Sequence, residues 1–147
     1  MNEQKFVVFC LGSERYGLPI ESVERILSAQ PVTRMPRAPK MILGVFELRG
    51  DTVAVMDVRT RFEMPSAEES KNFIVVLTDA GRCALAVDTV DGIVSYEPAE
   101  IDEPTAFQTS RAEEFVTGVG KKEGMLTLLI DSNLVVPEPA KKKLVAA

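Results

Sequence analysis

Part of this sequence occurs twice, and a chain made of two copies of one unit has few folds open to it. Residues 6–28 match residues 73–95 without a gap at an offset of 67 positions, with 7 identities among 23 positions. A second stretch matches at an offset of 74, where Gly44-Val45 corresponds to Gly118-Val119. Each copy has about 70 residues, a size at which a single core is marginal. We therefore expect the copies to pack together about a pseudo-twofold axis.

The apolar residues of each copy predict short β-strands joined by tight turns. Phe6–Leu11 is apolar at every position, which is typical of a strand buried on both faces. One face would line its own small barrel, and the other would meet the second copy. We therefore predict an all-β fold of two small barrels related by internal duplication, with short helical turns. One such turn is predicted by four aliphatic residues at helical spacing, Ile20, Val23, Ile26 and Leu27.

The junction between the copies falls in the polar stretch 65–71. This position predicts a first β-barrel half at 1–66 and a second at 67–136, and it leaves open which strands are exchanged between them. Residues 137–147 include Lys141-Lys142-Lys143 and lack a core pattern, so we expect a mobile C-terminal tail.

The chain contains no histidine and only two cysteines. This excludes Ser-His-Asp and Cys-His nucleophilic sites, zinc sites with imidazole ligands, and a four-cysteine zinc site within one chain. Catalysis could then depend only on carboxylates, lysines and backbone groups, and we predict no metal and no cofactor. We interpret Cys10 and Cys83 as small buried apolar residues. No apolar run reaches the roughly 18 residues of a membrane span, and the N-terminus lacks the pattern of a signal peptide. We therefore expect a cytoplasmic protein without direct membrane insertion.

The charge distribution favours a protein partner over nucleic acid. Arg34, Arg37 and Lys40 form a basic stretch, yet the net charge of the chain is −5 and aromatic residues make up only 6%. Residues 1–66 carry 9 basic and 8 acidic groups, whereas residues 67–147 carry 8 and 14. Such a dipolar molecule suits a protein partner better than a polyanion. A groove between two packed barrels could hold a partner helix through apolar anchors at helical spacing.

Several segments resemble the CheW family of bacterial chemotaxis scaffolds. They cover most of the chain in order: Phe9–Val23, Thr33–Pro39, Ile42–Gly50, Val53–Arg59, Ala86–Val90 and Phe115–Gly120. The resemblance implies two intertwined five-stranded barrels, similar to SH3 or OB folds, with strands exchanged between the halves. It also implies a non-enzymatic adaptor, monomeric when free, that couples transmembrane chemoreceptors to the histidine kinase CheA within a signalling array.

The resemblance also implies binding residues. The cytoplasmic tip of methyl-accepting chemoreceptors would contact six residues in the groove between the barrels, namely Val23, Gly44, Leu48, Arg49, Gly50 and Ile93. Phe107 would contact the CheW-like regulatory domain of CheA. Three positions depart from the family pattern, Glu47, Arg25 and Asp102, and they point to compensating charges on the partners.

Two alternatives stay open from the sequence. The first is a CheW-like interaction module of another pathway, such as twitching motility, or a CheV-like unit that lacks its receiver domain. The second is a small-barrel oligonucleotide binder, for which salt-dependent binding would be expected.

Overall fold

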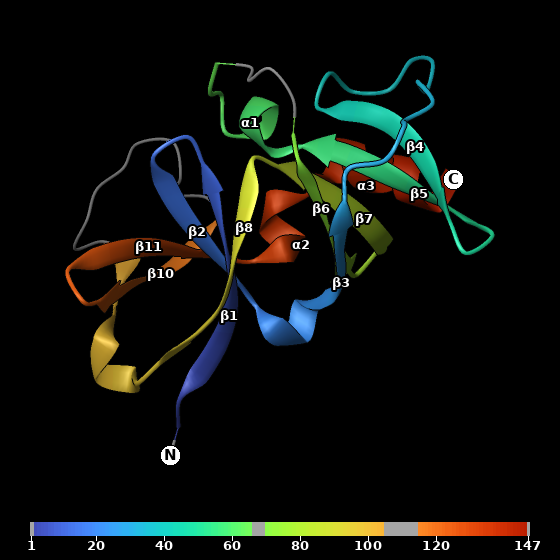
Figure 1. Cartoon of the computed structure of the whole chain (residues 1–147). Coiled ribbons are helices and arrows are strands. Elements are labelled where there is room, and N and C mark those ends of the chain that lie inside the picture. The colour runs from blue at the N-terminus through green and yellow to red at the C-terminus, as the bar shows by residue number, and fades with distance from the viewer. Residues whose placement is uncertain (1, 66–69, 105–114, 147) are drawn as a thin grey trace.

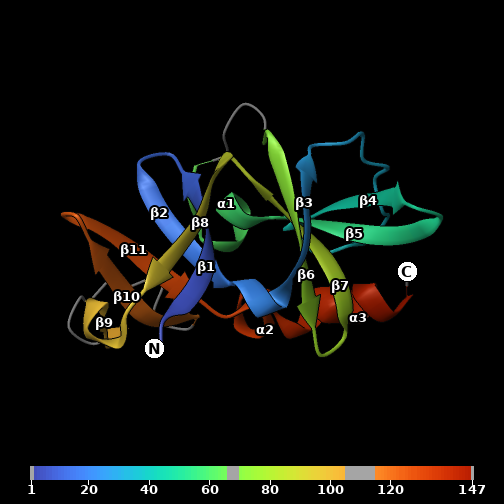
Figure 2. The ribbon, with the colours of Figure 1, turned by 60° about the horizontal axis from the view of Figure 1, so that its bottom comes forward.

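The computed structural model describes residues 2–65, 70–104 and 115–146, which form two β-sheets that lie next to each other (Figures 1 and 2). Sheet A has the strand order β8-β1-β2-β11-β10-β9, and sheet B has the order β3-β6-β7-β5-β4. The strands of sheet A are β1 (Gln4–Leu11), β2 (Glu14–Pro19), β8 (Thr89–Tyr96), β9 (Ile101–Asp102), β10 (Val116–Lys122) and β11 (Met125–Ile130). Those of sheet B are β3 (Val23–Ser28), β4 (Ile42–Leu48), β5 (Asp51–Asp57), β6 (Asn72–Thr78) and β7 (Gly81–Val87). The all-β prediction is confirmed, although neither sheet closes into a barrel within the described residues.

The two sheets are copies of each other. The repeat equates β1 with β6, β2 with β7, β3 with β8, β4 with β10 and β5 with β11, and this substitution turns the order of sheet B into that of β8-β1-β2-β11-β10 in sheet A. The register agrees as well. In the parallel pair of sheet B, Ala54 lies opposite Cys83, and at the equivalent place in sheet A, Leu128 lies opposite Tyr16. The predicted duplication is therefore present in topology and in register.

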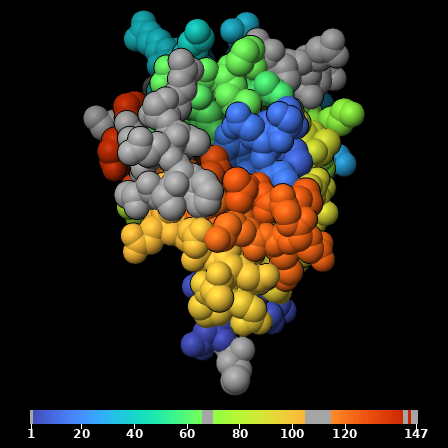
Figure 3. Space-filling model, turned by 90° about the vertical axis from the view of Figure 1, so that its left-hand side faces the viewer, coloured from blue at the N-terminus to red at the C-terminus, as the bar shows by residue number. Residues whose placement is uncertain are grey.

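The copies exchange strands in a definite way. Sheet A combines β1 and β2 of the first copy with β8, β10 and β11 of the second, and sheet B combines β6 and β7 of the second with β3, β4 and β5 of the first. The first hairpin of each copy thus lies in the sheet formed mainly by the other. In the space-filling view from the side of sheet A (Figure 3), the blue β2 lies against the orange β10–β11 hairpin. Sheet B is therefore whole once β7 ends, whereas sheet A needs strands from both ends of the chain.

Strands β5, β6 and β7 of sheet B bury side chains on both faces, which is the pattern predicted for Phe6–Leu11. In β7, Cys83, Leu85 and Val87 belong to the large core between the sheets, whereas Ala84 and Ala86 belong to a smaller cluster on the other face of sheet B. The large core takes residues from both sheets, and sheet A has a small cluster of its own. The burial of a large apolar side chain stabilises a fold by about 1.5–3 kcal/mol, so the shared core holds the two copies together.

The predicted helical turn is right in part. The short helix η1 covers Ile20–Ser22, but the chain then extends into β3, so Val23, Ile26 and Leu27 lie in a strand. The helical spacing was misleading there because β3 pairs with β6, and Ile26 lies opposite Ile74. Backbone pairing with a distant strand overrides a weak local preference, especially for a β-branched side chain.

Helical turns follow the last strand of each copy. The helices α1 (Val58–Arg61) and α2 (Ser132–Val135) begin after Asp57 and Asp131, whose carboxylates accept hydrogen bonds from the backbone N–H groups of Arg59 and Asn133. These aspartates are N-caps, and they are equivalent in the repeat. A second 3-10 turn, η2 (Pro98–Glu100), leads into β9.

The C-terminal segment differs from the expected mobile tail. Residues Glu138–Ala146 form the helix α3, Ala140 is fully buried, and Leu144 packs against the large core. Lys141 is 7% exposed, and its ammonium group lies 3.0 Å from the carboxylate of Asp79. The apolar part of a lysine side chain can cover a core while its ammonium group pairs with a carboxylate. This role could not be predicted from a run of three lysines in the sequence. None of the helices in the described ranges is long and apolar enough to cross a membrane.

Candidate protein-binding site

Strand direction gathers most of the predicted binding residues at one end of sheet B. Strand β7 is antiparallel to β6 and parallel to β5, and β3 is antiparallel to β6, so β3, β5 and β7 all begin at the same end of the sheet. The turn between β4 and β5 lies there too. Val23 and Leu48–Gly50 therefore share this end, which we call the turn end of sheet B.

Arg49 and Gly50 form the two-residue turn of the β4–β5 hairpin. Their φ angles are 51° and 87°, which is the left-handed geometry of a type I′ turn. Glycine adopts this conformation without strain, and Arg49 adopts it at some cost. Arg49 is exposed, and its guanidinium has no hydrogen bond or ion pair within the described residues. The turn thus presents a forked cationic donor to solvent.

Arg82 fastens this turn to the rest of the sheet. One guanidinium nitrogen lies 2.7 Å from a carboxylate oxygen of Asp51, and the other lies 3.5 Å from Glu24. The hydrogen bond to Asp51 raises the pKa of Arg82, and the negative charge of Glu24 raises it further. Because Asp51 follows Gly50 directly and Glu24 follows Val23, Arg82 fixes the Arg49 turn relative to β3. Arg82 was absent from the predicted site, and its match to Arg15 in the repeat was the available signal.

Apolar surface at the turn end comes from two half-buried residues. Val23 packs against the large core, and Leu48 packs against the smaller cluster of sheet B. Both expose part of their side chains, so a partner could cover them without disrupting the core. Leu48 supplies apolar contact area next to the cationic turn, and Val23 supplies it on the opposite edge strand of the sheet.

Ile93 lies apart from these residues. It belongs to β8, the edge strand of sheet A, and it is 57% exposed. Figure 2 shows β8 on one side of the molecule and the β4–β5 hairpin on the other. Its equivalent in the repeat is Ile26 on β3, the edge strand of sheet B, which is 39% exposed. The structure therefore places an exposed isoleucine on one edge strand of each sheet. Only Ile93 was among the predicted binding residues, although the repeat aligns it with Ile26.

Gly44 has an internal reason to be glycine. It is buried with φ of 151°, and a Cβ atom there would lie 2.1 Å from the carbonyl oxygen of Thr33. Thr33 and Val45 exchange two backbone hydrogen bonds of 2.8 Å across this contact. The close approach that we expected Gly44 to offer to a partner is thus made to the chain itself.

The remaining positions named from the family resemblance are Phe107 and the three that depart from the family pattern. Phe107 lies outside the described residues. Glu47 accepts a hydrogen bond from the hydroxyl of Thr52, Asp102 pairs with Lys121 at 2.6 Å, and Arg25 is exposed on β3. Of the three residues that depart from the family pattern, Glu47 and Asp102 therefore have partners within the chain.

A charged contact on the opposite side of the core joins the two sheets. Arg59 of α1 donates from Nε to a carboxylate oxygen of Asp88 at 2.9 Å, and the backbone N–H of Gly12 in the β1–β2 turn donates to the same carboxylate at 2.7 Å. The hydrogen bond from Arg59 lowers the pKa of Asp88, and the N–H of Gly12 lowers it further, although partial burial opposes both. This contact connects the β1–β2 turn of sheet A, the residue that follows β7, and the helix α1, which follows β5.

Comparison with known proteins gives a consistent result. The family model of the CheW-like domain matches residues 5–139. Chemotaxis protein CheW of Klebsiella aerogenes is 32% identical over 130 residues, which cover 87% of this chain and 78% of that protein. Protein FrzA of Myxococcus xanthus is 31% identical over 125 residues, which cover 83% of this chain and 77% of that protein.

A solved structure shows a similar fold over nearly the whole length. The crystal structure of the scaffolding protein TtCheW from Thermoanaerobacter tengcongensis superposes with a TM-score of 0.84 at 28% sequence identity. The match covers 93% of this chain and 94% of that one.

Proposed function

Since this chain belongs to the CheW-like domain family, we propose that it is a chemotaxis scaffold protein that couples transmembrane chemoreceptors to the histidine kinase CheA by binding both. The observation that carries this proposal is the turn end of sheet B, where the exposed Arg49 lies beside the half-buried Leu48 and where Val23 lies on the opposite edge strand. This combination is suited to holding a helix and does not require catalysis.

The turn end offers a receptor helix two kinds of contact. The guanidinium of Arg49 can donate paired hydrogen bonds to a carboxylate or to the free carbonyl groups at a helix end. Leu48 can pack against an apolar residue of the helix beside the Arg49 contact, and Val23, on the opposite edge strand, offers a separate apolar contact. Arg82 holds the turn in place before binding, so little conformational entropy is lost when the partner arrives.

Coupling requires a second surface for the kinase. The family resemblance assigns the CheA regulatory domain to a contact that includes Phe107, and this assignment remains a prediction. Simultaneous binding of both partners would recruit the protein from the cytoplasm to receptor arrays at the membrane.

The chain contains its own matched control for a test of Arg49. Glu123 and Gly124 form the equivalent turn between β10 and β11, with φ angles of 52° and 78°. We expect Arg49→Glu to weaken binding to a purified receptor cytoplasmic fragment about tenfold in calorimetry, because a charge-assisted contact becomes a repulsive one. Glu123→Arg reverses a charge in the same backbone conformation, and we expect it to leave receptor affinity within about twofold.

Circular dichroism and urea denaturation verify that both variants fold. A folded Arg49→Glu protein with normal receptor affinity would refute the assigned role of the turn. If neither the kinase nor the receptor fragment binds the wild-type protein, the coupling function itself is wrong.

A second candidate is an interaction module of the same family in another pathway, and the similarity to protein FrzA, a relative whose name is not CheW, keeps it open. The two candidates share a fold and differ in their partners. Affinity purification of the full chain from its native cells, followed by mass spectrometry, separates them by the kinase and receptors that it recovers.

A further inference from the structure

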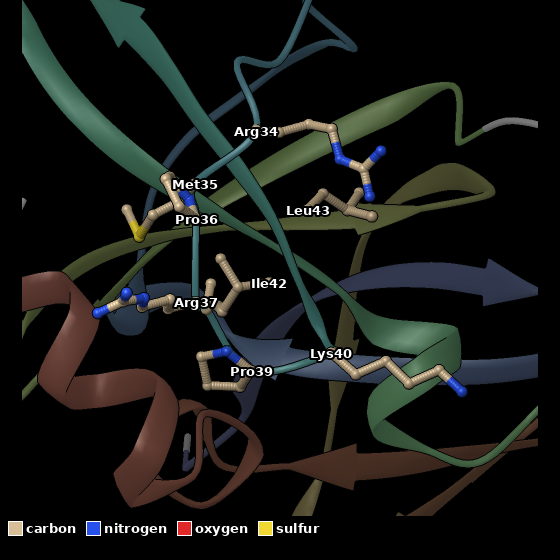
Figure 4. Close-up of a pocket in the computed structure, with 9 residues that line it drawn as sticks. Arg34, Met35, Pro36, Arg37, Pro39, Lys40, Ile42 and Leu43 are labelled. Carbon is tan, nitrogen blue, oxygen red and sulfur yellow. The ribbon is translucent and has the colours of Figure 1, made fainter.

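The loop between β3 and β4 surrounds an open hollow of about 810 Å³, which we call the basic hollow. Three cations, Arg34, Arg37 and Lys40, line it together with the apolar residues Met35, Ile42 and Leu43. Figure 4 shows Arg34 and Lys40 extending to one side of the loop and Arg37 to the other, with Ile42 between them. The hollow lies at the start of β4, at the opposite end of that strand from Arg49.

Backbone hydrogen bonds hold the loop at several points. The backbone N–H of Ile42 donates to the carbonyl of Pro39 at 2.9 Å, and that of Asp57 donates to the carbonyl of Met41 at 2.8 Å. The paired bonds between Thr33 and Val45 hold the other end. Ile42 is only 7% exposed and belongs to the large core, so the floor of the hollow is part of the folded framework.

The three cations of the basic hollow are not paired with acidic residues of the described part of the chain. Residues 29–46 contain three basic residues and no acidic residue, in a chain whose net charge is −5. Within the described residues, Arg34, Arg37 and Lys40 form no hydrogen bond or ion pair through their side chains. Arg82, Arg15 and Arg59, by contrast, all pair with carboxylates. Three unpaired cations therefore lie close together on the surface, within one loop.

We propose that the basic hollow binds an acidic peptide segment of a partner protein that carries one apolar side chain between its carboxylates. The apolar residue would pack on Leu43, which is 41% exposed, and over the floor at Ile42. The carboxylates on its two sides would meet Arg34 and Lys40 in one direction and Arg37 in the other. An extended segment suits this arrangement because the cations lie on both sides of the loop.

The lining of the hollow favours a peptide over a nucleic acid. A single strand of nucleic acid binds through bases stacked on aromatic rings as well as through phosphate contacts. None of the residues that line the hollow is aromatic. The net negative charge of the rest of the protein also opposes a long polyanion, whereas a short acidic segment meets only the local positive field.

Fluorescence anisotropy with a labelled peptide of glutamates around one leucine tests the proposal on the full chain. We expect saturable binding that weakens as salt is added. Arg37→Gln/Lys40→Gln should raise the dissociation constant about tenfold. Lys5→Gln/Arg25→Gln is the matched control, because it removes two exposed cations from elsewhere on the surface and should change the constant by less than about twofold.

A second comparison tests the apolar contact. Replacing the leucine of the peptide by serine should weaken binding to the wild-type protein about fivefold, and the Leu43→Ser variant should bind the two peptides equally. Urea denaturation verifies that each variant is folded. These assays contain neither receptor nor kinase, so their outcome is independent of the proposed coupling function.

Three results would overturn the proposal. The peptide does not bind, both double variants weaken it equally, or an oligothymidylate displaces it from the hollow with comparable affinity. The last result would assign the hollow to nucleic acid instead.

Discussion

The guanidinium of Arg15 lies 2.7 Å from the carboxylate of Asp91, and this ion pair joins the β1–β2 hairpin of the first copy to β8 of the second. The repeat produces the same contact in reverse, since Arg82 of the second copy pairs with Glu24 of the first. Both acidic residues occupy the position where the register between the edge strand and its neighbour shifts. The exchanged hairpins are thus held by two equivalent ion pairs, one in each sheet.

We predict that Arg15→Met lowers the free energy of unfolding by about 1 kcal/mol, because the arginine also donates to the hydroxyl of Thr127 and is only 19% exposed. Arg82→Met should cost less than Arg15→Met, because Asp51 is 63% exposed and solvent screens the pair. Urea denaturation of the two variants gives both values. A larger loss from Arg82→Met would contradict this ranking.

Asp88 is expected to make stability depend on pH. Its pKa in the folded protein is below the ordinary value of 3.8, chiefly because of the hydrogen bond from Arg59, so the unfolded chain binds the proton more tightly. The stabilisation is therefore complete above about pH 4 and is lost as the pH falls through the folded pKa. We predict that Asp88→Asn costs about 2 kcal/mol near neutral pH and that the difference from wild type shrinks in acid.

Glu21 is the control for that experiment, because it is the repeat equivalent of Asp88 and is exposed. Glu21→Gln should follow the wild-type curve in urea denaturation from about pH 3 to about pH 7. If Asp88→Asn differs from wild type by the same amount at every pH, the ion pair is not the source of the effect.

Gly44→Ala should destabilise the protein by about 3 kcal/mol, because the added Cβ would collide with the carbonyl of Thr33 in a left-handed backbone conformation. Gly50→Ala has a positive φ without any neighbouring atom within 4 Å, so it should cost only about 1 kcal/mol. Thermal unfolding measures both. Equal stabilities for the two variants would show that the contact with Thr33 does not require glycine.

The two cysteines should differ in their reactivity toward a thiol reagent. Cys83 is fully buried, and burial raises its pKa to about 12, so it should react only when the protein unfolds. Cys10 is partly exposed, and burial together with the negative charge of Asp91 raises its pKa. We therefore expect one thiol to react in the native state, and we expect Asp91→Asn to accelerate it. Rapid labelling of Cys83 without denaturant would contradict its burial.

Sequence reasoning succeeded where a signal was local or repeated. The apolar pattern identified Phe6–Leu11 as a strand buried on both faces, and the repeat established the equivalence of the two sheets. It failed at Val23–Ser28, where helical spacing was outweighed by pairing with β6. It also gave no sign of the helix at residues 138–146, where Ala140 is buried and Leu144 is partly buried against the large core. It also omitted Arg82 of β7, whose importance depends on two carboxylates that come from two other strands, β3 and β5.

The repeat in the sequence was enough to predict that two copies of one β unit pack about a common core. Which copy each hairpin joins follows from the folded structure alone. Because β3 and β8 are equivalent, β1 finds the same kind of neighbour in either copy, and local preferences do not distinguish the two pairings. The choice depends on contacts between residues far apart in the chain, such as Arg15 with Asp91, which exist only when the whole molecule has folded.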